Sequence, residues 1–105
     1  MIKVSILYPN KPGSRFNMDY YVTQHVPLAM GLLGRGLRKT EVDAGLQGTA
    51  PGQPPAFHGG CQFYFDTIEA FLEAWKSAAK ELTADIPRYT DVEPLIQFNE
   101  VKLSV

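Results

Sequence analysis

Three side chains near the start of the chain, Tyr8, Tyr21 and His25, are of types that could carry out acid/base chemistry. Tyr21 and His25 are four residues apart, so on a helix their rings lie on one side and can meet. Imidazole is the side chain best suited to exchange protons near neutral pH. We therefore take His25 as a candidate general acid/base, with the hydroxyls of Tyr8 and Tyr21 orienting a carbonyl or a phenol.

A structural role for the same three residues is equally compatible with the sequence. A buried neutral histidine bonded to backbone or to a tyrosine hydroxyl stabilises a core by about 1 kcal/mol per hydrogen bond. A buried tyrosine commonly anchors packing while its hydroxyl finds one partner. The two interpretations differ in a testable way. Catalysis requires that His25 face a cavity with a free nitrogen, whereas a structural histidine is sealed by backbone hydrogen bonds.

The segment around His25 has the periodicity of a helix over residues 17–33. Asn17 is suited to cap its start and Gly34 to end it. Pro27 has no backbone N–H and its ring crowds the preceding turn, so we expect a bend beside His25. The apolar positions predict a buried face made of Met18, Tyr21, Val22, His25, Leu28, Ala29 and Leu32.

The other elements follow from hydrophobic alternation and turn residues. Strands are predicted over Ile2–Tyr8, Leu37–Leu46, Phe57–Phe65 and Leu95–Leu103, with a Gly/Pro-rich loop over Gln47–Pro55. A second helix is predicted after Asp66, which has capping-box spacing to Glu69. Its buried stripe is Ile68, Phe71, Leu72, Trp75, Ala79 and Leu82.

The resulting order, βαββαβ, predicts one α+β domain over residues 1–105 with a ferredoxin-like fold. Four antiparallel strands then carry both helices on one face. The other face includes Leu7, Tyr64 and Val101 among polar residues. Large apolar groups left in water would form an exposed patch, so we expect a second copy to cover this face and form a homodimer.

The composition excludes several classes of partner. The net charge is −1 with no run of either sign, which argues against nucleic acid and gives no reason to expect binding to anionic membranes. No segment is long and apolar enough to span a bilayer. Cys61 is the only cysteine and the N-terminus lacks a signal peptide, so we expect a cytoplasmic protein.

The remaining reactive side chains favour structural roles. Cys61 lies among phenylalanines, as an inert buried thiol would, and His58 is expected to face solvent or the dimer seam. Glu41 and Asp43 fit a solvated strand edge better than a metal site. The chain has two histidines and no glycine-rich nucleotide loop, so we expect no metal and no cofactor.

Two segments resemble the signature of the EthD family, named after ethyl tert-butyl ether degradation. The first contains Leu7-Tyr8-Pro9, Phe16 and Tyr20-Tyr21, leading to His25, Pro27 and Leu28; the second contains Asp85-Ile86-Pro87 and Tyr89-Thr90-Asp91. The resemblance covers nearly the whole chain and implies a ferredoxin-like fold that pairs into a dimeric α/β barrel. Members of that superfamily include cofactor-free monooxygenases, cyclases, isomerases and haem proteins, so the fold does not select a chemistry.

Three functions are compatible with the sequence. The first is a homodimeric EthD-like protein that performs cofactor-free acid/base chemistry on a small apolar or aromatic oxygenated compound in catabolic or secondary metabolism. The second is a non-catalytic ligand-binding accessory module of a monooxygenase system. The third is a haem-binding protein with His25 as the axial ligand.

Overall fold

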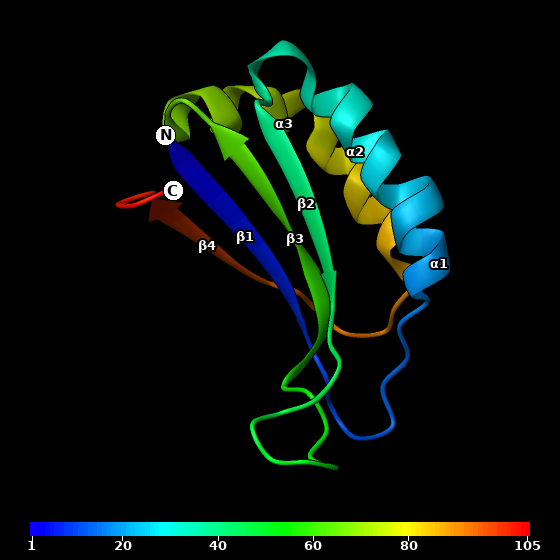
Figure 1. The fold of residues 1–105 in the computed structure, drawn as a ribbon. Coiled ribbons are helices and arrows are strands. Elements are labelled where there is room, and N and C mark those ends of the chain that lie inside the picture. Colours follow the sequence, from blue (N-terminus) through cyan, green and yellow to red (C-terminus); the bar gives the residue numbers. More distant parts are fainter.

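A computed structural model describes residues 1–105. Its elements (Figure 1) are, in chain order, β1 (Ile2–Pro9), α1 (Met18–Tyr20), a π-helical turn η1 (Tyr21–His25), α2 (Val26–Leu33), a 3₁₀ turn η2 (Gly34–Gly36), β2 (Lys39–Ala44), β3 (Phe57–Phe65), α3 (Ile68–Asp85), a 3₁₀ turn η3 (Ile86–Arg88) and β4 (Leu95–Glu100). None of the helices combines the length and hydrophobicity that a bilayer-spanning helix requires.

The four strands form one sheet in the order β2-β3-β1-β4. Every neighbouring pair is antiparallel. The helices lie together on one face of this sheet, as Figure 1 shows. The predicted α+β, ferredoxin-like fold is therefore confirmed.

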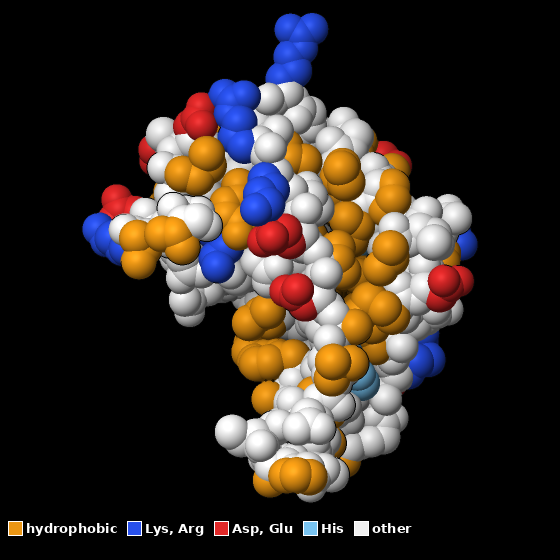
Figure 2. Space-filling view, in the orientation of Figure 1, with side chains coloured by type: hydrophobic (Ala, Val, Ile, Leu, Met, Phe, Trp, Pro, Cys, Tyr) orange, Lys and Arg blue, Asp and Glu red, His pale blue; other side chains and the backbone are white.

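The core lies between the helices and the inner face of the sheet. Inward-facing strand residues such as Val4 and Phe65 are fully buried and belong to one hydrophobic cluster with Phe71 and Leu82 of α3. Burial of each such side chain stabilises the fold by roughly 1.5–3 kcal/mol. At the edge of the sheet, Figure 2 shows charged side chains scattered along β2 and hydrophobic side chains gathered where this strand meets the helices.

The first helix contains a widened turn next to Pro27. The N–H of Val26 bonds the carbonyl of Tyr21, five residues earlier, so residues 21–25 form a π-turn. Pro27, in the first turn of α2, has no N–H to give to the preceding turn, and a π-turn is one way to accommodate this loss. The irregularity expected beside His25 is therefore present, as a π-turn.

This extra residue per turn changes which side chains are buried. Because Tyr21 and Val26 are joined by the π-turn, the buried face continues through Val26, Ala29 and Leu33. Val22, predicted to be buried, is 47% exposed. The prediction for Val22 was wrong because it assumed a uniform period of 3.6 residues.

The ends of the elements differ modestly from their predicted positions. Asn17 caps α1 as expected. The N-cap of α3, however, is Thr67, whose hydroxyl accepts from the N–H of Ala70. Asp66 instead forms an ion pair with Arg38 at 2.8 Å, so the predicted capping box was wrong. Strands β2 and β4 are also shorter than their predicted ranges.

The face of the sheet that the helices leave uncovered is largely polar. Leu7 pairs in register with Leu95 of β4, which places two leucines side by side on this face. Elsewhere polar side chains bond one another: Tyr64 donates to Glu41 at 2.8 Å, and Asn99 donates to Ser5 at 3.1 Å.

Candidate functional site

His25 and Asp85 form a hydrogen-bonded pair where the first helix meets the end of α3. Nδ1 of His25 lies 2.9 Å from Oδ2 of Asp85. The two side chains are only 9% and 13% exposed, respectively. The π-turn ends at His25, and Asp85 is the last residue of α3. Packing of the two helices therefore brings together residues from distant parts of the chain.

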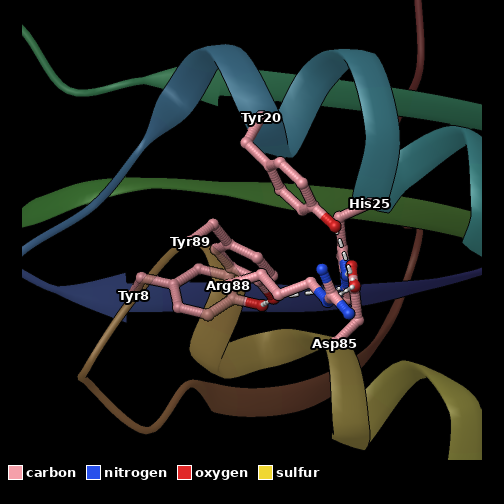
Figure 3. Close-up of polar contacts among 6 residues, drawn as sticks. All are labelled: Tyr8, Tyr20, His25, Asp85, Arg88 and Tyr89. Atoms are coloured by element: carbon pink, nitrogen blue, oxygen red, sulfur yellow. Dashed lines mark hydrogen bonds and ion pairs between the residues drawn. The ribbon is translucent and has the colours of Figure 1, made fainter.

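The other imidazole nitrogen faces a buried pair of tyrosines. Nε2 of His25 lies 3.2 Å from the hydroxyl of Tyr89, which lies 2.6 Å from the hydroxyl of Tyr8. Tyr8 comes from β1 and Tyr89 follows the turn η3. The side chains thus form a continuous row from the sheet to the helices (Figure 3).

Asp85 also has partners on its outer side. The hydroxyl of Tyr20 donates to Oδ1 of Asp85 at 2.8 Å. Nε of Arg88 lies 3.4 Å from the same oxygen, and the Arg88 side chain is 71% exposed. Figure 3 shows these groups converging on the carboxylate. The hydrogen-bonded row therefore reaches from buried Tyr8 to the surface of the protein.

Tyr21 contacts His25 through its ring. The two rings stack with centroids 5.6 Å apart and planes 15° from parallel, as the spacing of four residues predicts. No hydrogen bond joins the Tyr21 hydroxyl to His25. The three residues selected from the sequence therefore do meet, but Tyr8 reaches the imidazole through Tyr89 and Tyr21 only by stacking.

The surroundings of His25 favour its neutral form. Burial lowers the pKa of His25 below its ordinary value, against the opposing effect of Asp85. Desolvation also opposes ionisation of Asp85, but hydrogen bonds from His25 and Tyr20 hold the pKa of this carboxyl below its ordinary value. Burial raises the pKa of Tyr8, Tyr21 and Tyr89. Near neutral pH the row consists of neutral phenols, a neutral imidazole and a carboxylate.

A cavity of about 290 Å³ lies beside this row, between the sheet and the helices. Ten of its 14 lining residues are hydrophobic. Tyr8, Tyr21 and His25 all line it, together with apolar side chains such as Trp75 and Ile96. A small, mostly apolar cavity with a few convergent polar groups is typical of a site for a small organic molecule.

The other reactive side chains lie away from this cavity. Cys61 is fully buried, and burial raises its pKa to about 12. His58 stacks on Phe16 and bonds the hydroxyl of Ser14 at 2.7 Å. Glu41 bonds Tyr64 on the uncovered face of the sheet. No three His, Cys, Asp or Glu side chains lie close enough together to hold a metal ion.

Asp85 and Tyr89 were not selected as site residues from the sequence. Each contacts His25 directly, across 60 and 64 residues of chain. A signal was present in the sequence, because both residues belong to the second EthD-like segment and are four residues apart. Their contact with His25 depends on how the two helices pack, which spacing along the chain does not specify.

Comparison with known proteins identifies a family and solved structures that share this fold. Residues 15–93 match the model of the EthD domain. The chain is similar to the crystal structure of an EthD-like protein from Ralstonia eutropha, with 38% identity and a TM-score of 0.95 over 99% of this chain and 94% of that one. No curated protein matches the chain.

Two more distant structures share the fold. An ethyl tert-butyl ether degradation family protein from Bacillus halodurans is 21% identical, with a TM-score of 0.66 over 96% of this chain and 98% of that one. HapK from Hahella chejuensis is 14% identical, with a TM-score of 0.58 over 100% and 97% of the two chains.

Proposed function

The chain belongs to the EthD family, and we propose that it uses His25 as a general acid/base on a small apolar oxygenated compound held in its cavity. The observation that carries this proposal is the position of His25 in the cavity wall. One of its nitrogens is held by Asp85 and the other lies next to a phenol.

Asp85 prepares the imidazole to act as a base. Its carboxylate accepts a hydrogen bond, so it favours the tautomer with the proton on Nδ1. Nε2 then carries a lone pair and accepts from the hydroxyl of Tyr89. Asp85 also stabilises the imidazolium that forms when Nε2 takes up a proton, which is the role of the carboxylate in a catalytic His–Asp pair.

The two phenols extend this base towards the cavity. Tyr89 donates to His25, so the 2.6 Å contact between the two phenols is a donation from Tyr8 to Tyr89. When the Tyr8 oxygen takes a proton from a ligand, Tyr8 passes its own hydroxyl proton to Tyr89. Tyr89 in turn passes its hydroxyl proton to Nε2 of His25. Tyr8 and His25 both line the cavity, so either can contact the ligand.

The reaction class that fits these groups is reversible proton transfer. In the forward step, a C–H bond next to a carbonyl breaks and its electrons remain on the ligand as an enolate. The proton moves to Nε2 through the two phenols, and returns to the same or another carbon of the ligand. The ligand loses and regains one proton and no electrons, so the reaction needs no oxidant or reductant.

The two alternative functions find less support. Neither nitrogen of His25 is free and neither bonds backbone, so the structure meets neither of the two conditions set from the sequence, and the bond to Tyr89 is one that a structural histidine would also make. Catalysis is favoured because both partners are side chains that can exchange protons and because His25 lines the cavity. Ligation of a haem iron by His25 would break one of these two hydrogen bonds. Proton transfer uses both of them as they stand.

We propose that the protein is a homodimer formed through the uncovered face of the sheet. Leu95 is 58% exposed and pairs with Leu7 on that face, so a second copy would bury an apolar patch. The surrounding side chains are polar, which implies an interface rich in hydrogen bonds and water. Light scattering after size exclusion should give twice the mass of one chain.

A substitution on the same face tests this dimer. Leu95→Lys should shift the protein towards the monomer, because it places a charge in the interface. The matched control is Leu72→Lys, which changes a 45% exposed leucine on α3, away from the uncovered face. A monomeric wild-type protein would refute the dimer, as would equal masses for the two variants.

The proposed proton transfer can be tested with a panel of simple compounds that share the expected chemistry. Small aromatic ketones, phenols and lactones are screened for stabilisation of the folded protein, because a bound ligand raises the melting temperature. Each stabilising ketone or lactone is then incubated in D₂O, and proton NMR follows the exchange of C–H for C–D. We expect His25→Gln to slow this exchange by about 100-fold or more.

The matched control is His58→Gln, which removes the other histidine of the chain and should leave the rate unchanged. Exchange at the wild-type rate in His25→Gln would contradict the proposal. Failure of every stabilising ketone and lactone to exchange would contradict it as well.

A further inference from the structure

The rim of the cavity carries a negative charge and no positive one. Besides Tyr8, Tyr21 and His25, the polar lining residues are Thr83 of α3 and Glu93, which precedes β4. Both are exposed, and Glu93 has no partner among the ion pairs of the protein. A ligand entering the cavity therefore meets an uncompensated carboxylate.

The nearby cations are engaged elsewhere. Arg88 pairs with Asp85, and neither residue lines the cavity. The guanidinium of Arg15 donates to the carbonyl of Pro87 at 3.2 Å. Arg15 and Glu93 both line a neighbouring surface depression but form no ion pair, and Arg15 does not line the cavity.

The cavity wall around His25 adds no positive charge that would compensate Glu93. His25 is neutral near pH 7, and behind it stands the carboxylate of Asp85. An anionic ligand would thus lie near the carboxylate of Glu93 with no cation in the cavity wall. A neutral or cationic ligand meets no such repulsion and can donate a hydrogen bond to Glu93.

We propose that the cavity selects compounds with an apolar body and a hydroxyl or amino group, that it rejects carboxylates, and that Glu93 sets this selectivity. The inference rests on the proposed function, since it takes the same cavity as the ligand site. It goes further by naming the charge and the polar group that the ligand carries besides its carbonyl, and the residue that discriminates.

The chain contains its own probe for testing this selectivity. Trp75 lines the cavity and is the only tryptophan, so a ligand that enters should change its fluorescence. Three compounds of nearly equal shape differ in charge: phenethylamine is cationic, 2-phenylethanol is neutral and phenylacetate is anionic. Each is titrated into the wild-type protein and into Glu93→Gln at pH 7.

We expect the amine and the alcohol to bind the wild-type protein more tightly than phenylacetate. Removing one partly solvated charge should raise the affinity for phenylacetate by about three- to tenfold in Glu93→Gln, and lower that for the amine by a similar factor. In Glu93→Gln the affinity for the alcohol should change less than the affinity for phenylacetate or for the amine. The matched control, Glu69→Gln, alters an exposed glutamate at the other end of α3 and should change none of the three.

Two results would overturn the inference. One is phenylacetate binding the wild-type protein as tightly as the amine, and the other is an unchanged order of affinities in Glu93→Gln. Neither result would affect the proton-transfer proposal, which depends on His25. Conversely, the expected charge selectivity combined with normal C–H exchange in His25→Gln would contradict that proposal alone. Failure of all three compounds to bind would overturn the charge selectivity alone, because none of them is a ketone or lactone of the kind that tests the proton transfer.

Discussion

The imidazole Nδ1 of His25 lies 2.9 Å from the carboxylate Oδ2 of Asp85, across 60 residues of chain. This contact holds the ring between the end of α3 and the hydroxyl of Tyr89. It also fixes the imidazole tautomer, on which the proposed chemistry of the site depends.

Asp85→Asn should lower the pKa of His25 further. Burial already lowers this pKa, and the carboxylate is the group that opposes the shift. Its neutral replacement removes the charge while keeping the size of the side chain. Proton NMR of the imidazole signals against pH measures the change, and Asp19→Asn, at an exposed position in the first turn of α1, is the control. An unchanged His25 titration in Asp85→Asn would show that the pair has no electrostatic effect.

Protein stability should fall as the pH decreases below the ordinary histidine value. The pKa of His25 lies below 6.5 in the folded state, so between these values the unfolded chain binds more protons than the folded one. The free energy of unfolding therefore decreases with falling pH in this range. The lowered pKa of Asp85 has the same sign and adds a further loss below its ordinary value of 3.8.

Urea unfolding between about pH 5 and pH 7 measures this dependence on pH. The change of stability with pH should be smaller in His25→Gln than in the wild-type protein. An identical slope in His25→Gln and the wild-type protein would refute the assignment to His25.

Tyr89→Phe should destabilise the protein more than the loss of one exposed hydroxyl would. The substitution removes the bonds to both His25 and Tyr8 and leaves two buried polar groups without this partner. The expected cost is about 1–3 kcal/mol in the free energy of unfolding. Tyr64→Phe, which removes an exposed hydroxyl bonded to Glu41, is the control. Equal losses in the two variants would mean that the buried row of phenols adds no stability.

Ala29→Leu should block the cavity from within. Ala29 is 2% exposed and lines the cavity, so a larger side chain takes up space that a ligand needs. We expect weaker binding of every compound that stabilises the wild-type protein, with overpacking costing at most about 1–3 kcal/mol. Thermal shift and Trp75 fluorescence measure both effects. Unimpaired binding in a folded Ala29→Leu variant would place the ligand site elsewhere.

Much of the fold could be predicted because the hydrophobic periodicity of each element is strong. The stripe of α3, apart from Leu72, which is 45% exposed, and the alternation of β3 predicted these two elements correctly. The first helix was predicted less well. Its π-turn shifts burial from Val22 to Val26, and a pattern with one fixed period misses this shift.

Part of the candidate site could also be predicted from spacing along the chain. His25 and Tyr21 share one helix, so their spacing implies contact, and the observed stacking agrees with it. Asp85 and Tyr89 reach His25 only because α2 packs against α3. Such a contact depends on tertiary packing, and local spacing carries no information about it.

The most direct test of acid/base action by His25 is the protonation state of its ring, read from ¹⁵N NMR at pH 7. We predict a neutral imidazole with its proton on Nδ1, facing Asp85, and a bare Nε2 that accepts from Tyr89. A proton on Nε2 with a bare Nδ1, or an imidazolium at this pH, would contradict the proposed role, because His25 would then have no lone pair to offer on its Tyr89 side.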